Sequence, residues 1–143
     1  MERFSDKVDD SLCVGQRRPQ DSDERVLLFL KMRTGHRFTP ELVSNIRAAI
    51  KNSLSARHVP AYIFEVRDIP VSVQYYFLSS WELTMSPQYT VNNKKIEIAV
   101  KQIVSGSNLM PSGTVANPES LDNYYKFRNI ENIVEDEQRE SKL

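Results

Sequence analysis

Two adjacent lysines, Lys94 and Lys95, follow a polar pair of asparagines and are well suited to chemistry on anions. A lysine ammonium is a compact positive charge on a long stem. It can therefore follow negative charge that develops on the oxygens of a reacting carboxylate or phosphate. Exposed lysines are also common at solvated corners that bind nothing. From the local residues alone, the solvated corner is the default interpretation.

A second basic group lies in residues 42–64, a stretch that contains no Asp or Glu. It carries Arg47, Lys51, Arg57 and His58, and the first two are four residues apart, so they would share one face of a helix. Such a face suits an anionic partner such as a nucleotide, a coenzyme or a nucleic acid. Solvated basic helix faces that need no ligand are equally common.

The elements that would position these residues follow from the periodicity of the sequence. Apolar residues in 10–14, 25–33 and 61–67 predict three strands, and the first two should pair. A helix-start signal at residues 39–41 predicts a long helix that ends near Ser55. The apolar positions that make one buried stripe on this helix are Leu42, Val43, Ile46, Ala49, Ile50 and Leu54.

The lysine pair itself should sit on a hairpin. Asn92 and Asn93 tolerate positive φ angles, so they predict a tight turn after a strand at residues 90–91. Apolar residues between 96 and 103 recur at helical spacing, although 96–98 also alternate like a strand, and we favour a second, short helix. The predicted fold class is α+β, a small three-stranded sheet with two main helices and a lysine-bearing hairpin.

A family resemblance appears when residues 71–88 are set aside and Pro70 is joined to the sequence YTVNNKKIEIAVKQI at 89–103. This order resembles the C-terminal lysine motif of acyl-adenylate-forming enzymes, in particular the acetoacetyl-CoA synthetase family. The resemblance extends through ERVLLFLKM, LSARHVP and SGTVANPESLD and covers most of residues 9–125. It implies the C-terminal lid domain of those enzymes. The family usually has Gly where Asn93 stands, and Asn is the next most tolerant residue of a left-handed conformation.

The resemblance implies an ATP-dependent acetoacetate–CoA ligase that works in two steps. Acetoacetate attacks the α-phosphate of ATP in the presence of Mg²⁺, and coenzyme A then displaces AMP. Lys94 would be the catalytic adenylation lysine on a mobile lid, and Lys51 and Arg57 would bind the phosphates of coenzyme A. No metal ligands are expected in this chain. The family's phosphate loop, adenylation motif and hinge aspartate do not occur in the sequence, so we expect the chain to be inactive without a large N-terminal domain.

Two other functions stay open at this point. The chain could be a stand-alone α+β module that binds a nucleotide or another anion through Arg47, Lys51 and Arg57. It could also be a truncated product without activity. Inspection of the coding sequence upstream of Met1 would separate these alternatives from the ligase.

Residues 71–88 are foreign to the family, because there the equivalent of Pro70 runs directly into the equivalent of Tyr89. The segment holds the only Trp of the chain and is rich in other aromatic residues. A partner-binding loop is one explanation. A translated intron is the one that we favour, since Val71-Ser72 and Gln88 can be encoded by intron border sequences and the length keeps the reading frame.

Composition predicts one domain at residues 1–125 and a disordered acidic tail at 126–143, because residues 131–143 are acidic and poor in apolar side chains. Cys13, the only cysteine, should be a small core residue, and no disulfide or metal cluster is expected. No apolar run approaches the roughly 20 residues of a membrane span and no signal peptide is evident. We expect an intracellular soluble protein with no nucleic-acid or membrane partner. Its terminal Ser141-Lys142-Leu143 resembles the address read by the peroxisomal import receptor, so we favour peroxisomal delivery over the cytosol.

Overall fold

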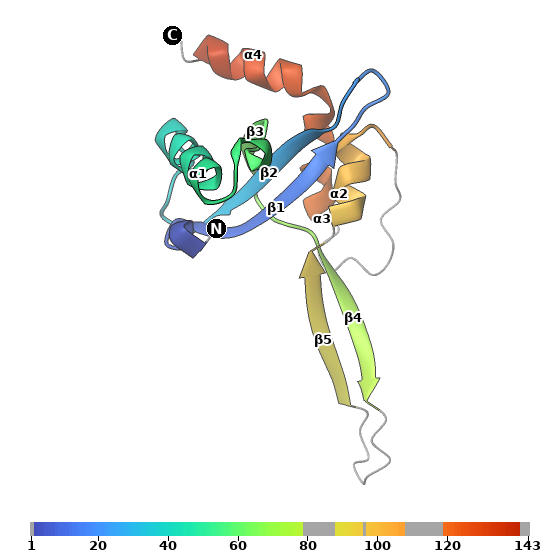
Figure 1. Ribbon diagram of the computed structural model, residues 1–143. Coiled ribbons are helices and arrows are strands. Elements are labelled where there is room, and N and C mark those ends of the chain that lie inside the picture. Colours follow the sequence, from blue (N-terminus) through green and yellow to red (C-terminus); the bar gives the residue numbers. More distant parts are fainter. Residues whose placement is uncertain (1, 79–87, 96, 108–118, 141–143) are drawn as a thin grey trace.

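The computed structural model describes residues 2–78, 88–95, 97–107 and 119–140, and within 71–95 it describes the backbone alone. It has a mixed three-stranded sheet with helices on both faces and a separate two-stranded hairpin (Figure 1). The predicted α+β class is confirmed. The elements are β1 (Val8–Gln16), β2 (Arg25–Met32), α1 (Pro40–Ser53), β3 (Tyr62–Glu65), β4 (Val71–Leu78), β5 (Gln88–Lys95), α2 (Glu97–Val104), α3 (Glu119–Asp122) and α4 (Ile130–Glu140), with 3₁₀ turns at Glu2–Phe4, Ala56–His58 and Tyr125–Asn129.

The sheet has the order β1-β2-β3, and the predicted pairing of the first two strands is confirmed. β1 runs antiparallel to β2, whereas β3 runs parallel to β2 with Leu27 opposite Tyr62 and Leu30 opposite Glu65. A parallel neighbour requires a crossover connection, because the chain must return to the same end of the sheet. Helix α1 is that connection.

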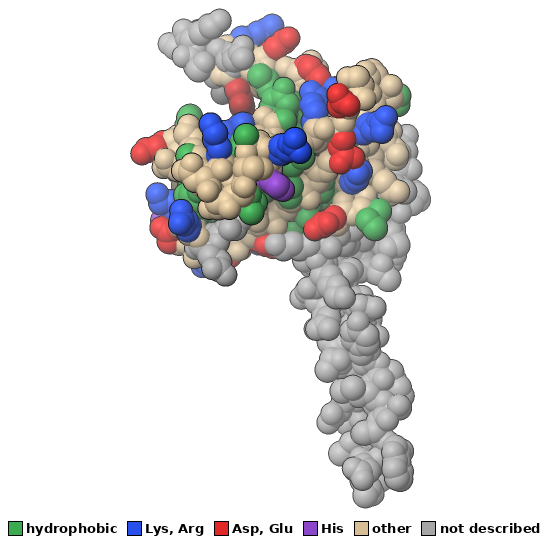
Figure 2. Space-filling model, in the orientation of Figure 1, with side chains coloured by type: hydrophobic (Ala, Val, Ile, Leu, Met, Phe, Trp, Pro, Cys, Tyr) green, Lys and Arg blue, Asp and Glu red, His purple; other side chains and the backbone are tan. Residues whose placement is uncertain are grey.

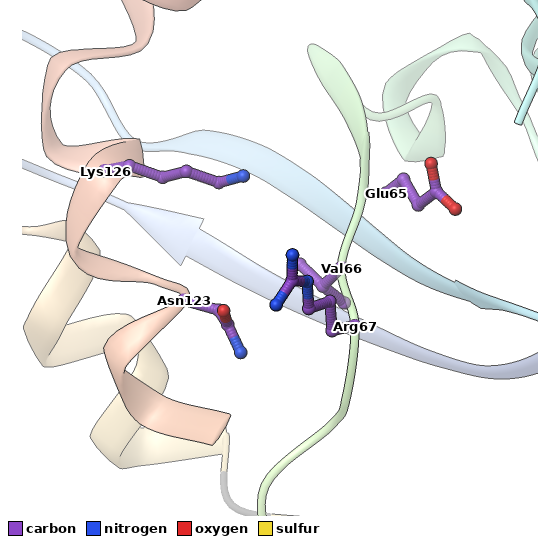
Figure 3. A pocket seen from close by; sticks show the side chains of 5 residues that line it. All are labelled: Glu65, Val66, Arg67, Asn123 and Lys126. Carbon is purple, nitrogen blue, oxygen red and sulfur yellow. The ribbon is translucent and has the colours of Figure 1, made fainter. Parts of the chain in front are cut away.

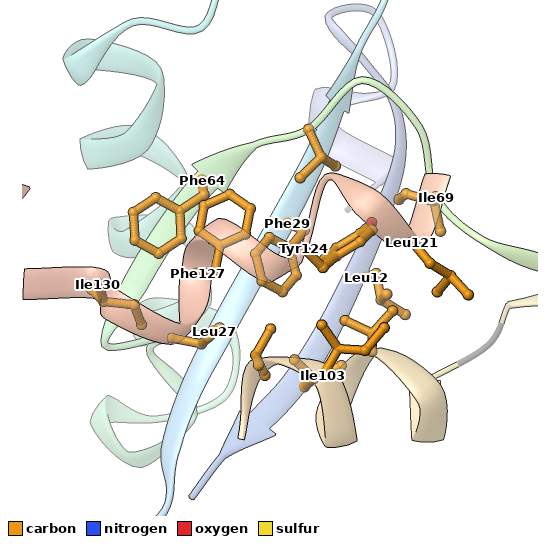
Figure 4. Packing of buried hydrophobic residues seen from close by; sticks show 14 residues of the cluster. Leu12, Leu27, Phe29, Phe64, Ile69, Ile103, Leu121, Tyr124, Phe127 and Ile130 are labelled. Carbon is orange, nitrogen blue, oxygen red and sulfur yellow. The ribbon is translucent and has the colours of Figure 1, made fainter. Parts of the chain in front are cut away.

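Strand β2 is covered on both faces, as its continuous apolar run predicts. Leu28 and Leu30 pack on the face that carries α1, together with Leu42 and Ile46. The opposite face holds the larger core (Figure 4). Its buried residues come from the sheet, from α2 and from the C-terminal helices: Leu12, Val14, Leu27, Phe29, Phe64, Val66, Ile69, Val100, Ile103, Val104, Leu121, Tyr124, Phe127 and Ile130.

An irregularity in β1 decides which side chains face the core. The register with β2 shifts between Val8 and Asp10, so Val8 packs on the α1 side while Leu12 and Val14 pack on the other. Cys13 is exposed, and its prediction as a core residue was therefore wrong. The physical reason is the strand period of two, which turns Cys13 away from the face that Leu12 and Val14 occupy.

Helix α1 begins as the sequence predicts. The Thr39 hydroxyl oxygen accepts a hydrogen bond from the backbone N–H of Leu42 at 3.2 Å, which satisfies one free donor of the first turn. Leu42 and Ile46 are buried, but Leu54 is 68% exposed. The predicted stripe is thus too long by one position, because the helix ends at Ser53 and Leu54 is the cap beyond it.

The C-terminal segment is helical where the sequence predicted disorder. The 3₁₀ turn Tyr125–Asn129 leads into α4, and Phe127 and Ile130 belong to the larger core. Three apolar residues at 130, 133 and 134 lie at helical spacing and pack against that core, which explains why an otherwise acidic segment is ordered up to Glu140. None of the helices in the described part of the chain has the length and apolarity to cross a membrane.

Candidate functional site

The predicted catalytic residue, Lys94, lies near the end of strand β5. Its backbone is opposite Ser72 of β4, and Lys95 is opposite Val71. Helix α2 begins two residues later, at Glu97. The end of the ladder that holds Lys94 is therefore the end next to the body of the domain (Figure 1). The side chain of Lys94 lies outside the described residues, so the backbone alone locates it here.

The predicted turn at Asn92 and Asn93 was wrong. Both residues lie within β5, opposite Gln74 and Val73, and the chain reverses between Leu78 and Gln88 instead. The reason is that residues 71–78 supply a partner strand. With a partner available, the backbone groups of 88–95 form ladder hydrogen bonds, and the turn preference of two asparagines is a weaker local effect. The short helix predicted after the lysines is confirmed as α2.

The chain segments that enter and leave the hairpin are both attached to the larger core. On the β4 side, the hydroxyl of buried Tyr124 donates a hydrogen bond to the carbonyl of Asp68 at 3.0 Å, just before the hairpin starts. Burial, together with the nearby charge of Asp68, raises the pKa of Tyr124, which keeps the hydroxyl protonated as a donor. On the β5 side, α2 packs three fully buried residues into the core, Val100, Ile103 and Val104.

Gln16 is a positioning residue that sequence reasoning missed. It is fully buried, and its side-chain amide donates to the carbonyls of Val104 at 2.9 Å and Phe127 at 3.0 Å. These two bonds join the end of β1 to the end of α2 and to the C-terminal 3₁₀ turn. A signal for it was present, because Gln16 continues the inward alternation of Leu12 and Val14 along one strand.

The basic residues of 42–64 do not act as one group. Arg47 donates to the carbonyl oxygens of Pro60 at 3.0 Å and Ala61 at 2.9 Å, so its guanidinium holds the entry to β3. Lys51 and Arg57 are exposed at the end of α1 and in the 3₁₀ turn that follows it. In the same turn the Ser55 hydroxyl and His58 Nδ1 are 2.8 Å apart.

The structure does not bring Lys94 together with Lys51 and Arg57. Helix α1 packs on one face of the sheet, whereas α2, which follows Lys94, packs on the other. On the face shown in Figure 2, basic and acidic side chains are interspersed over the described residues. That face therefore has no continuous basic surface of the kind that a nucleic acid would need.

Within the described part of the chain, no grouping of His, Cys, Asp and Glu could hold a metal ion. Two cations, Arg67 and Lys126, instead line a hollow of about 300 Å³ between the exit of β3 and the C-terminal helices (Figure 3). This pair could not be predicted from the sequence, because its members are 59 positions apart in the chain.

Comparisons with known proteins point to one group of enzymes, although no family model matches the sequence. Over 119 residues the chain is 48% identical to acetoacetyl-CoA synthetase of Rattus norvegicus. The matched residues make up 83% of this chain and 15% of that protein. Over 128 residues it is 43% identical to acetoacetyl-CoA synthetase of Gallus gallus. Here the matched residues make up 90% of this chain and 16% of that protein.

A solved structure gives the same result. Acetoacetyl-CoA synthetase from Streptomyces lividans superposes with a TM-score of 0.60 at 25% identity, over 83% of this chain and 15% of that one. The chain thus spans about 15% of the length of the relatives that it matches.

Proposed function

The chain belongs to the acetoacetyl-CoA synthetase family, of which it spans a C-terminal part, and on this premise we propose that it carries the adenylation lysine of an acetoacetate–CoA ligase. The observation that carries the proposal is the identity of 43–48% over more than four fifths of the chain. In the complete enzyme, acetoacetate would attack the α-phosphate of ATP and release pyrophosphate. The thiol of coenzyme A would then displace AMP from the acyl-adenylate.

Lys94 is the proposed catalytic residue of the first step. Negative charge moves onto the leaving pyrophosphate and the phosphoryl oxygens as the carboxylate attacks, and an ammonium placed beside them lowers the barrier. The position of Lys94 next to the body supports this role, because rotation of the domain would carry the ladder end with it as one piece. Mobility of the domain as a lid is part of the proposal.

Lys51 and Arg57 are the proposed contacts to the phosphates of coenzyme A. Both side chains are exposed, and within the described part of the chain neither has a hydrogen bond or an ion pair. Because they lie on the α1 side of the sheet, they would act in a different orientation of the lid from Lys94. Magnesium is expected to enter with ATP. The described residues offer it no ligand set, so we assign it none here.

The experiment uses a full-length version in which this chain is joined to a large N-terminal domain. Lys94→Ala should lower ATP–pyrophosphate exchange by a factor on the order of 10²–10³, as loss of one preorganised charge on a transition state does. Thioester formation from preformed acetoacetyl-adenylate should persist. Lys95→Ala is the matched control and should keep both activities.

Lys51→Gln is the contrasting variant, since it should keep exchange and raise KM for coenzyme A. Equal exchange in Lys94→Ala and the parent protein would refute the assignment of Lys94. The 143-residue chain alone should show no exchange, because one lysine cannot supply the many kcal/mol of preorganised contacts that adenylation requires.

We also propose that Ser141-Lys142-Leu143 directs the protein to peroxisomes through the import receptor. These three residues lie outside the described part of the chain. The support is the match of these three residues to that address and the position of the preceding helix α4, whose C-terminal half extends away from the sheet in Figure 1. The alternative location is the cytosol.

A further inference from the structure

Two cations, Arg67 and Lys126, lie on opposite sides of the hollow in Figure 3, and the core holds the backbone of both in place. Arg67 follows strand β3, directly after Val66, which is buried and whose N–H donates to the carbonyl of Leu30 at 2.9 Å. Lys126 lies in the 3₁₀ turn between two fully buried aromatic residues, Tyr124 and Phe127. Both backbone segments are therefore anchored in the larger core while their charged side chains reach solvent.

The side chains converge on the space between these two segments. Figure 3 shows Arg67, Asn123 and Lys126 directed into the hollow, while the carboxylate of Glu65 points to the other side of the strand. The ammonium of Lys126 lies 4.9 Å from the centroid of the Phe127 ring, an arrangement that steadies a long side chain. Asn123 Nδ2 donates to the Ser120 carbonyl at 3.4 Å, which leaves its second N–H for another acceptor.

Among the described residues, no carboxylate forms an ion pair with either cation of the hollow. Some other cations of the described chain are engaged: Arg18 with two carboxylates, Lys31 with Asp68, and Lys101 with Glu24. Arg67 and Lys126 have no ion pair or hydrogen bond to any described residue, although they line one hollow. Two like charges that face a common space repel each other unless an anion lies between them.

We propose that this hollow binds a phosphate group of a small soluble molecule. A guanidinium presents a planar fork that matches phosphate oxygens, and an ammonium and an amide N–H complete a set of donors from three directions. Two cations match the charge of about −1.5 to −2 that a phosphate carries at neutral pH better than that of a monocarboxylate. The volume of about 300 Å³ lies at the lower limit for ligand pockets, which favours a compact ligand. The site shares no residue with Lys51, Arg57 or Lys94.

The test is a nuclear magnetic resonance titration of the full chain with inorganic phosphate at constant ionic strength. Saturable shifts of the backbone amides should cluster at residues 65–67 and 123–126. Arg67→Gln and Lys126→Gln should each weaken binding about tenfold, the usual loss for a hydrogen bond to a charged group. Both side chains are exposed, so the variants should keep the dispersed spectrum of a folded protein.

Arg37→Gln is the matched control, because Arg37 is exposed, has no partner among the described residues and lies outside the hollow. It should leave binding unchanged. A second titration with phosphoserine shows whether the site takes a phosphomonoester or the free phosphate ion. Saturable binding of either ligand supports the site. Shifts that do not saturate, equal affinity for acetate, or undiminished binding in Arg67→Gln would overturn the proposal.

Discussion

At the scale of single residues, Arg18 anchors the C-terminal segment to the loop between β1 and β2. Its guanidinium is 7% exposed and binds both carboxylate oxygens of Glu131, at 2.7 and 2.9 Å, and both oxygens of Asp21, at 2.9 and 3.0 Å. It also donates to the carbonyl of Arg128 at 2.8 Å. A buried guanidinium that binds two carboxylates is fully paired. Removing one partner of such a pair destabilises the folded protein, because part of the buried charge is then uncompensated.

These hydrogen bonds predict an acid-sensitive domain. The Arg18 guanidinium lowers the pKa of Asp21 from 3.8 to about 2 and that of Glu131 from 4.5 to about 2. Because both pKa values are depressed in the folded state, the stabilisation is complete above about pH 5 and is lost as pH falls towards 2. The free energy of unfolding, measured by denaturant titration at several pH values, should fall through this window.

Glu131→Gln tests the origin of that pH dependence. The free energy of unfolding of this variant should be lower by about 1 kcal/mol at neutral pH. The loss is small because the Glu131 side chain is 54% exposed and its charge is screened by water. It should also show a shallower decline between pH 5 and 2. Glu135→Gln, on the same helix and exposed, is the matched control and should behave like the parent protein. An identical decline in the Glu131 and Glu135 variants would contradict the assignment.

At the scale of elements, the β4–β5 hairpin determines the conformation around Lys94. β4 is made entirely of residues 71–78, which belong to the segment that we expect to be foreign to the family, and it pairs with all eight residues of β5. The hairpin forms a sheet separate from β1-β2-β3. The segment therefore adds an element without entering the main sheet, and it changes a predicted turn into a strand at Asn92 and Asn93.

Deletion of residues 71–88 should leave the main sheet, α1 and α2 intact, because none of these elements pairs with β4. The melting temperature should stay constant or rise, since a shorter connection lowers the entropy lost on folding by only a modest, logarithmic amount. In the full-length version we expect the deletion to raise the rate of adenylation above that of the parent, because the lysine segment regains the short connection that we expect of its family. Thermal unfolding and pyrophosphate exchange are the two measurements.

A second variant separates the ladder from the length of the segment. Replacing residues 79–87 by Asn-Gly gives a two-residue hairpin between Leu78 and Gln88 and keeps every pair of the ladder. If the ladder restrains Lys94, this variant should keep the adenylation rate of the parent and not reach the higher rate of the deletion. Unfolding of the domain after deletion of 71–88 would instead make the segment an integral part of the structure, and the intron hypothesis would be wrong.

At the scale of the whole molecule, the packed body extends past the predicted boundary at residue 125. Phe127 and Ile130 are fully buried, and Phe127 lies between the rings of Phe29 and Phe64 at centroid distances of 4.9 and 4.8 Å. The acidic residues of α4 beyond Val134 are exposed where they are described. The terminal segment is thus part core and part extension, and the extension carries the last residues of the chain.

The terminal tripeptide predicts delivery of the whole molecule to peroxisomes. A fluorescent reporter fused to the N-terminus of the full chain keeps α4 packed and leaves Leu143 at the end. We expect punctate fluorescence that coincides with a peroxisomal marker. The version that lacks Leu143 is the control and should be diffuse, and a diffuse signal from both would mean that the tripeptide has no targeting role.

The sequence alone determined the features that depend on neighbours within a few residues. Helix α1 was predicted from the helical spacing of Leu42 and Ile46 and from the cap at Thr39. The continuous apolar run of β2 indicated a strand covered on both faces. The motif around Lys94 pointed to the family. The role of Lys94 and the contacts of Lys51 and Arg57 came from that resemblance and stay predictions.

Only the tertiary structure decided features that depend on partners far along the chain. Gln16 bonds to residues 88 and 111 positions away, and Arg18 binds a carboxylate 113 positions away. Arg67 and Lys126 meet across one hollow for the same reason. The turn propensity of Asn92 and Asn93 gave way to a strand because a distant segment offered backbone partners, and the acidic tail became helical because the core accepted Ile130. Local propensities amount to fractions of a kcal/mol per residue, so burial and ladder pairing override them.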